Sequence, residues 1–377
     1  MLKKKIYDID ILILGGGCSG LSLAYYLSFL PNNLNILIIE NKKLYYNDKT
    51  WCGWRIKNHA FINCCKKTWY NIKIKKEKNS YSIINFSIPY EYILSILFYK
   101  KIINRIKILQ NIKIYNNKIL NIKEYNEYVS IKLNNGEYKI AHWVIDTLPK
   151  KIKINLPWKW QNFFGIELYS NKKYSKPSLM NFYINKYLKS NKLNFIYILP
   201  INKNQILFEW TNFYKKKNLY IKKLLIYYIN IVLGIYNYKI LRKETGHIPM
   251  AYIINKKKLK NLAKIYGCYI RPSTGYSFNE IQNWAIKCAY NLSINKKIII
   301  PKVPYFLIFL DYIYMKTNEF FPKNSLLLYN NIFYKIKSNT FIKFFTNNPN
   351  IIDIFNILFF LKPKSILLYT FIMILFK

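Results

Sequence analysis

The first forty residues constrain the fold of this chain more than any other segment. Residues 9–14 are almost all apolar, and they are followed at once by Gly15, Gly17 and Gly20, which have the spacing G-x-G-x-x-G. A helical pattern begins directly afterwards, and a second apolar run ends in Glu40. A buried parallel strand has such a continuous apolar sequence. The order of strand, glycine turn, helix, strand and acid therefore predicts a Rossmann-like α/β unit that binds a dinucleotide.

Each residue of this motif has a physical role. Gly15 allows a tight turn, Gly17 lets the backbone approach a pyrophosphate, and Gly20 lets the helix pack closely on the strand. The amino end of the helix faces the phosphate charge, and Glu40 can accept hydrogen bonds from a ribose. The motif alone does not choose between FAD and NAD. Its place at the start of the chain favours a flavoprotein that holds the adenine end here.

The charge of the chain is strongly unbalanced. Lys and Arg number 60 against 17 Asp and Glu, which gives a formal charge of +43. Such an excess favours an anionic membrane or a polyanion as partner. However, Lys, Asn, Ile and Tyr are abundant throughout and share A/T-rich codons, so compositional drift also explains the charge. With no arginine-rich tail or zinc-finger spacing, we expect no nucleic-acid partner.

Cysteine usage and hydropathy bear on the compartment. The six Cys and three His residues lack metal-site spacing, so we expect no metal, reduced thiols and a cytoplasmic protein. No apolar run reaches the roughly 18 residues of a membrane span. The longest, residues 366–376, predicts either a core helix or an element that dips into one leaflet.

Pattern changes along the chain predict three regions. Residues 1–149 together with 244–300 contain the glycine motif and a later loop-plus-helix pattern, and they predict a discontinuous nucleotide-binding domain. Residues 150–243 hold short alternating runs between Asn/Lys turns, which are typical of an antiparallel sheet. Residues 301–377 are rich in Phe, Leu, Ile and Tyr at helical spacing, so we expect a helical, membrane-facing region.

Acidic residues are scarce, so their surroundings are informative. Glu209 interrupts the apolar run ILFEWT, and on a strand it shares a face with Leu207 and Thr211. Burial among apolar neighbours raises the pKa of a carboxyl group, which makes it a proton donor at neutral pH. The alternative is a solvent-facing Glu on a half-exposed strand. Glu167, in FFGIELY, is a weaker copy of the same pattern.

The segment RPSTGYSF, residues 271–278, is a third candidate. Pro and Gly predict a tight loop, and its hydroxyls and backbone amides lead into the start of a helix. This geometry can receive an anion, although an ordinary capped loop has the same pattern.

Taken together, five segments resemble one family. In order, they are GGGCSGLSLA, NDKTWCGW, LFEWT, ETGHIPM and RPSTGYSF, and they resemble the bacterial and plant-type lycopene beta-cyclases over nearly the whole chain. The resemblance implies a glutathione-reductase-like FAD domain, a mostly antiparallel β-sheet substrate domain and a helical C-terminal region. It also implies an intramolecular lyase or isomerase that closes the ends of lycopene and other linear carotenoids, giving gamma-carotene and then beta-carotene. FAD would be kept reduced by NAD(P)H, with no net redox change.

The family motifs also imply roles for single residues. Glu209 takes the place of the essential first acid, and Trp210 replaces the usual second acid, so any auxiliary role of that acid is absent. The glycine-rich lead that usually precedes RPSTGYSF is missing from residues 265–270. The residues that we expect to bind FAD are Gly15, Gly16, Gly17, Cys18, Ser19, Gly20, Glu40, Asp146, Arg271, Pro272, Ser273, Thr274, Gly275 and Tyr276.

We expect a peripheral membrane association, with other enzymes of the carotenoid pathway as partners. Two other classes of function stay open. One is a flavin-dependent hydroxylase or reductase that acts on another isoprenoid lipid. The other is a flavin-binding or membrane-interacting protein without catalysis.

Overall fold

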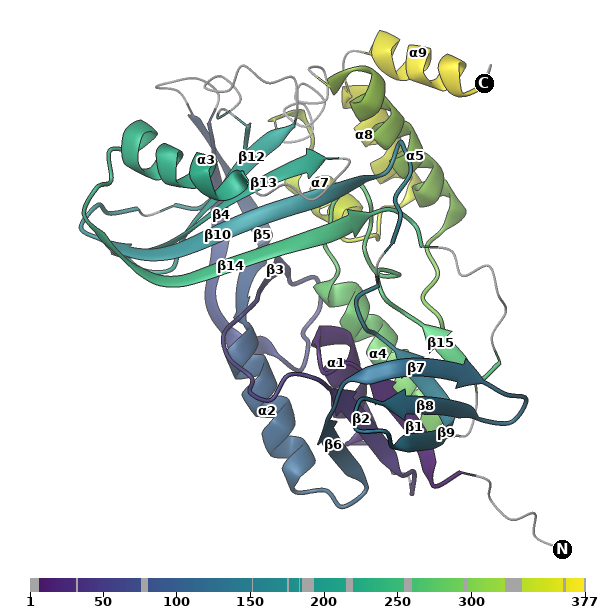
Figure 1. Cartoon of the computed structure of the whole chain (residues 1–377). Helices are drawn as coiled ribbons and strands as arrows, with labels where there is room; N and C mark the ends of the chain where they lie inside the picture. Colours follow the sequence, from purple (N-terminus) through teal and green to yellow (C-terminus); the bar gives the residue numbers. More distant parts are fainter. Residues whose placement is uncertain are drawn as a thin grey trace, which may run out of the picture.

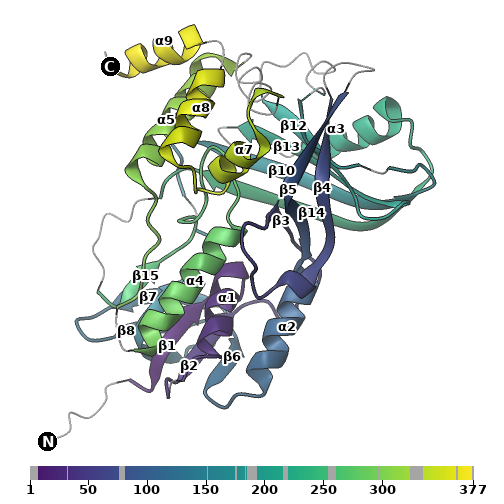
Figure 2. The same cartoon turned by 180° about the vertical axis from the view of Figure 1, so that it is seen from behind.

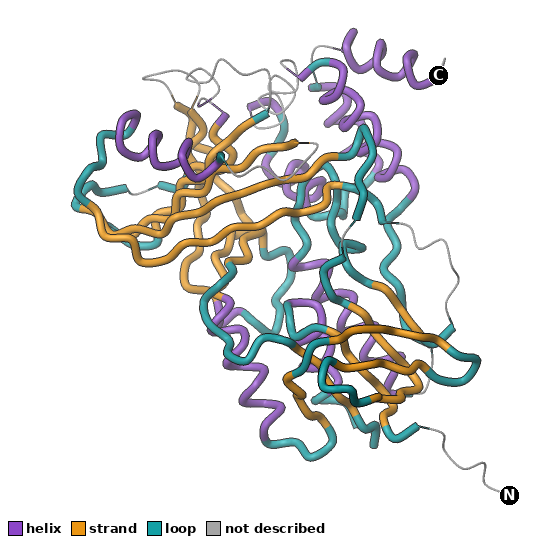
Figure 3. Tube along the Cα trace, in the orientation of Figure 1, coloured by secondary structure: helices purple, strands orange, loops and turns teal. Residues whose placement is uncertain are grey.

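The computed structural model of the chain describes residues 7–31, 33–75, 81–150, 152–174, 176–182, 184, 193–214, 220–253, 260–294, 297–322, 334–361 and 364–375. The strands gather in two groups, one formed by the N-terminal sheet and one by a larger antiparallel assembly, with loops between them (Figure 3). The C-terminal helices lie beside the antiparallel assembly, at the end of the molecule away from β1 (Ile9–Leu14) (Figure 1).

The first sheet contains the predicted dinucleotide-binding unit. Its strand order is β6-β2-β1-β9-β8-β7, with β15 paired to β9. The five strands β6, β2, β1, β9 and β15 are parallel, while β7 and β8 are antiparallel additions. The bounds are β1 Ile9–Leu14, β2 Ile36–Glu40, β6 Ile112–Asn116, β7 Ile119–Glu124, β8 Val129–Leu133, β9 Tyr138–Asp146 and β15 Leu262–Lys264. Every residue of β1 is buried, which explains its unbroken apolar sequence.

Three helices cover one face of this sheet. They are α1 (Cys18–Leu27), α2 (Ser95–Lys107) and α4 (Phe278–Ser293). Their apolar faces form one core with Ile11 and Ile13 of β1, whereas Leu12 and Leu14 pack on the opposite face against β8. The predicted α/β class is therefore confirmed, and α4 comes from a segment more than 200 residues after α1.

The second sheet has five antiparallel strands in the order β11-β12-β13-β10-β14. The bounds are β10 Lys159–Ser170, β11 Ser178–Asn181, β12 Asn194–Pro200, β13 Gln205–Tyr214 and β14 Tyr238–Met250. The antiparallel sheet expected in this part of the chain is present. The boundary expected between residues 243 and 244 lies inside β14, which pairs with β10 along its whole length. Residues 244–250 are thus part of this sheet, because its hydrogen-bond ladder continues across the expected boundary.

A third sheet, β3-β5-β4, packs against the inner face of the second. Its strands are β3 Thr50–Trp54, β4 Cys65–Lys75 and β5 Tyr81–Leu94, and the short helix η1 (Ile62–Cys64) precedes β4. Residues from both sheets and from the C-terminal helices share one hydrophobic core. The outer face of the second sheet is covered by α3 (Ile221–Tyr227) and η3 (Tyr228–Val232). The second sheet thus has an outer face, which α3 and η3 cover, and an inner face, which is directed toward the rest of the molecule.

The C-terminal region is helical where the structure describes it. The helices are α5 Tyr305–Phe320, α7 Ser338–Phe345, α8 Ile351–Phe360 and α9 Lys364–Leu375. α9 lies at the outer edge of the molecule and exposes Leu368, Tyr369 and Ile372, so it is not a core helix (Figure 2). Among the described residues, no helix has both the length and the apolar composition needed to cross a bilayer.

Candidate active site

The glycine turn after β1 has the geometry that a dinucleotide needs. Gly15 has φ +99°, a conformation that a residue with a side chain adopts only under strain. A Cβ at Gly20 would lie 2.0 Å from the carbonyl oxygen of Gly15, so only glycine lets α1 pack this closely. A Cβ at Gly17 would have no atom within 4 Å, so the space beside the helix start is open. The glycines therefore fit the roles expected of them.

Two acids flank this turn at the carboxyl edge of the sheet. The Glu40 carboxylate accepts hydrogen bonds from the backbone N–H groups of Gly16 (2.6 Å) and Lys42 (2.7 Å). Asp146 ends β9 beside Leu14, is fully buried, and forms an ion pair with Lys150. Both acids lie beside the turn, and their contact with a nucleotide stays a prediction.

The remaining residues of the turn suit an extended ligand. Cys18 and Ser19 form the half-buried first turn of α1, and burial raises the pKa of the Cys18 thiol. A Cβ at Gly16 would lie 2.1 Å from the hydroxyl oxygen of Tyr45. That hydroxyl is buried and has no hydrogen-bond partner among the described residues. An unpaired hydroxyl beside a glycine turn and an open helix start fits a dinucleotide such as FAD.

The loop before α4 contributes to a second part of the site. Gly275 has φ +77°, and a Cβ there would lie 2.9 Å from Oε1 of Gln161. Thr274, Gly275 and Tyr276 line a pocket that Glu209 also lines. The structure therefore brings together the LFEWT and RPSTGYSF motifs, which lie at residues 207–211 and 271–278 of the chain.

Not every residue of the loop faces this pocket. Pro272 and Ser273 are buried, and Ser273 lines a neighbouring apolar cavity between the C-terminal helices. The Arg271 side chain is turned away, because its guanidinium pairs with Asp311 of α5 and lies on the ring of Phe344. The geometry thus places Arg271 in the packing of the C-terminal helices rather than against a ligand in this pocket.

Glu209 lies on β13 with its side chain on the inner face of the sheet. Leu207 packs in the inner core, while Phe208 and Trp210 pack outward against α3, so the predicted alternation is confirmed. The Thr211 hydroxyl donates a hydrogen bond to Glu209 (3.2 Å). Burial, followed by the nearby charge of Glu244, raises the pKa of Glu209 to about 8. The carboxyl group is therefore mostly protonated at neutral pH.

Aromatic side chains line much of the pocket around Glu209. Six of them come from four strands, the α4 loop and the first residue of α4: Trp51, Tyr90, Phe163, Tyr197, Tyr276 and Phe278. The hydroxyls of Tyr90 and Tyr276 are 3.3 Å apart. Burial raises the pKa of both tyrosines, so these side chains stay neutral. A proton donor surrounded by neutral aromatic faces suits the formation of a carbocation.

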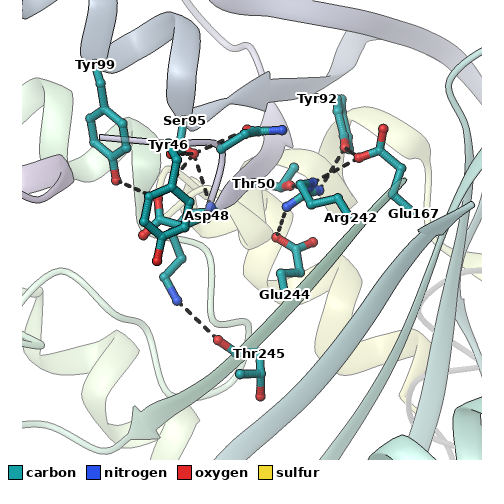
Figure 4. A network of polar contacts seen from close by, with 12 residues as sticks. Tyr46, Asp48, Thr50, Tyr92, Ser95, Tyr99, Glu167, Arg242, Glu244 and Thr245 are labelled. Carbon is teal, nitrogen blue, oxygen red and sulfur yellow. Dashed lines mark hydrogen bonds and ion pairs between the residues drawn. The ribbon is translucent and has the colours of Figure 1, made fainter. Parts of the chain in front are cut away.

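Next to the pocket is an ion cluster that the sequence analysis did not identify. Arg242 of β14 donates to Glu244 (2.8 Å) and to Glu167 of β10 (3.0 Å), and it also contacts Thr50 and Tyr92 of the third sheet (Figure 4). Glu167 therefore belongs to this cluster and is not a second donor in the pocket. The signal was present in the motif ETGHIPM, whose acid we assigned no role.

Comparison with known protein families identifies the group to which this chain belongs. Residues 10–298 match the family described as "Lycopene cyclase protein", and this range includes the glycine turn, Glu209 and the α4 loop. The chain belongs to the lycopene cyclase family. Among curated proteins, no sequence matches it significantly.

Solved structures share the fold of this lycopene cyclase family member. A geranylgeranyl bacteriochlorophyll reductase-like protein from Thermoplasma acidophilum is 15% identical, with a TM-score of 0.60 over 94% of this chain and 96% of that one. A flavoprotein/dehydrogenase from Cytophaga hutchinsonii is 12% identical, with a TM-score of 0.56 over 95% and 92%. The halogenase PltM, solved with phloroglucinol and FAD, is 13% identical, with a TM-score of 0.55 over 90% and 82%. The chain therefore shares its fold with a flavoprotein/dehydrogenase and with a halogenase that was solved with FAD.

Proposed function

We propose that this protein is a lycopene beta-cyclase that closes the linear ends of lycopene to beta rings by acid catalysis, with no net redox change. The observation that carries the proposal is Glu209, a carboxyl group with a pKa raised to about 8 in an aromatic pocket beside the α4 loop. Membership of the lycopene cyclase family supports the same substrate class.

The first step is protonation of a carbon–carbon double bond, which is a weaker base than water. The donor must therefore be protonated, positioned and shielded from solvent. Glu209 gives its proton to a terminal double bond, and the carbocation that results is attacked by a neighbouring double bond of the same chain. Loss of a proton from the ring then restores the hydrogen count, so the product is an isomer of the substrate.

The carbocation has to be stabilised without a nucleophile that would capture it. The aromatic faces of Trp51, Phe163 and Phe278 in this pocket can do so, at about 0.5–2 kcal/mol each. We propose that the glycine turn and residues 274–276 hold FAD. Bound there and reduced by NAD(P)H, this group would supply negative charge that stabilises the carbocation.

A carotenoid has negligible solubility in water, so we propose that the protein takes its substrate from a membrane surface. The C-terminal helices expose several large apolar side chains: Phe306, Phe309, Ile351, Ile352, Phe355, Phe359 and Leu368. The excess of Lys adds attraction to an anionic leaflet, about 1 kcal/mol per basic residue near the surface. An apolar cavity between these helices reaches Thr274, which also lines the Glu209 pocket. We propose that the substrate passes from the exposed helices to the acid through this cavity.

A second function is favoured by one observation. The similar structure from Thermoplasma acidophilum is described as reductase-like, so this chain could instead reduce or hydroxylate another isoprenoid lipid. Such an enzyme consumes one NAD(P)H for each product molecule. A cyclase uses NAD(P)H only to prime the flavin, so the ratio of NAD(P)H consumed to product formed separates the two functions.

The direct test is expression in bacteria that accumulate lycopene, followed by pigment analysis. We expect beta-carotene from the wild type, and a loss of ring formation of about 10²- to 10⁴-fold with retained flavin absorbance from Glu209→Gln. Glu137→Gln makes the same change on an exposed loop and should cyclise like the wild type. Full activity of Glu209→Gln would refute the proposal.

A further inference from the structure

Glu209 and Glu244 face each other across a residue that has no side chain. Gly165 of β10 is the register partner of Glu209 on β13 and of Glu244 on β14. Directly opposed residues of antiparallel strands project to the same face. The two carboxyl groups therefore lie on one face, with Cα atoms about 10 Å apart from two strand spacings.

Gly165 is required here for space and not for its backbone conformation. A Cβ at this position would lie 2.9 Å from Cγ and 3.2 Å from Oε1 of Glu244, and 3.3 Å from Cδ1 of Leu207. The Glu244 side chain thus leans over Gly165, into the row that separates it from Glu209. Any larger residue would push the Glu244 carboxyl group out of this row.

The Glu244 carboxyl group is only partly satisfied. Its Oε2 accepts from Arg242 (2.8 Å), but the same guanidinium also binds Glu167 (3.0 Å), so one cation is shared by two acids (Figure 4). Oε1 of Glu244 is buried and has no hydrogen-bond partner among the described residues. A buried oxygen without a partner is costly, which indicates a function beyond the ion pair.

We propose that Glu244 is a positioning residue for the reaction, because its unshared oxygen, held across Gly165, disfavours ionisation of Glu209 and keeps the proton on the acid. This inference rests on the proposed function. It assigns a role to an acid outside the LFEWT motif, on a different strand of the sheet, in a chain where Trp210 stands at the second-acid position of that motif.

The other groups that face Glu209 do not replace this effect. They come from the third sheet, from the neighbouring strands and from the α4 loop: Cys52, Tyr197, Tyr276 and Arg242. Burial raises the pKa of Cys52, Tyr197 and Tyr276, so these groups stay neutral. Arg242 acts in the opposite direction, since its positive charge favours the ionised form of Glu209. After burial, Glu244 is the remaining influence that holds the proton on Glu209.

The test is an infrared titration of the Glu209 carboxyl group in the purified protein, with its band assigned by its loss in Glu209→Gln. In Glu244→Gln we expect the midpoint to fall by about one pH unit, because a like charge is removed and Arg242 is left less neutralised. The alkaline limb of the pH–rate profile for cyclisation should move down equally. Glu244→Asp keeps the charge, so the midpoint of the Glu209 titration should lie close to the wild-type value.

Two further variants make the outcome specific. Glu167→Gln removes the other negative charge that pairs with Arg242. The register partner of Glu167 is Leu207, so we expect a clearly smaller shift of the Glu209 midpoint. Gly165→Ala retains Glu244 but displaces it, and should lower the midpoint as Glu244→Gln does. An unchanged midpoint in folded Glu244→Gln and Gly165→Ala would overturn the inference. A lowered midpoint in a protein that does not cyclise lycopene would support the charge coupling and overturn only the proposed function.

Discussion

Arg271 and Asp311 form a fully buried ion pair, with Nε and Oδ1 3.0 Å apart, between the loop that precedes α4 and helix α5. Asp311 also accepts a hydrogen bond from Tyr252 (2.5 Å), and Arg271 donates to the carbonyl of Phe344. The pair therefore connects the loop that lines the Glu209 pocket to two C-terminal helices. Its charges hold these helices in place beside the pocket.

Breaking this pair should destabilise the protein strongly. Arg271→Met leaves the Asp311 carboxylate buried and unpaired, and we expect a loss of about 3–5 kcal/mol in the free energy of unfolding. Urea unfolding followed by circular dichroism measures it. Lys343 forms an ion pair with Asp353 but its side chain is 44% exposed, so Lys343→Met should cost less than about 1 kcal/mol. Equal costs for the two variants would contradict the structural role of Arg271.

Substitution by Ala should cause a different defect at each of two glycines of the turn, Gly17 and Gly20. Gly20→Ala places a methyl group 2.0 Å from the Gly15 carbonyl oxygen, so it should lower the melting temperature even without flavin. Gly17→Ala meets open space in the protein, so the melting temperature should stay unchanged while FAD binding weakens at least tenfold. Thermal unfolding and fluorescence titration with FAD separate the two effects. Normal FAD binding by Gly17→Ala would argue against a pyrophosphate at this helix start.

The raised pKa of Glu209 makes stability depend on pH. The group titrates at about 8 in the folded protein against an ordinary value of 4.5, so the folded state binds more protons between these values. Stability from this group is therefore complete below about pH 4.5 and is lost as the pH rises to about 8. We expect the melting temperature of the wild type, relative to that of Glu209→Gln, to fall between pH 5 and pH 8. Above pH 8 the difference between the two melting temperatures should stay constant. A difference that is independent of pH would show that Glu209 titrates normally.

Membrane binding should depend on the apolar face of the C-terminal helices. The double variant Phe355→Ser, Phe359→Ser removes two exposed rings of α8, and burial of each ring is worth about 1.5–3 kcal/mol. We expect the affinity for anionic liposomes, measured by co-sedimentation, to fall at least tenfold. Leu120→Ser, Tyr138→Ser removes comparably exposed residues on the first sheet and should bind as the wild type does. Equal loss in both double variants would point to binding through general charge and hydrophobicity.

Local features of the fold could be predicted because they depend on residues close together in the chain. The glycine spacing, the continuous apolar strand and the acid at the end of β2 follow from backbone conformation and from burial on both faces. The face of Glu209 followed from strand alternation, since its neighbours along β13 pack as the period of two requires.

Contacts between segments that are far apart in the chain were decided by the tertiary structure. Whether residues 366–376 form a core helix or an exposed one depends on whether other helices leave room to cover it, and α9 is exposed. The direction of Arg271 depends on Asp311, forty residues further along the chain. The approach of Glu244 to Glu209 depends on two strand registers that meet at Gly165. Registers and ion pairs between distant segments are set by packing of the whole core, whereas a sequence pattern reports only on its own strand or turn.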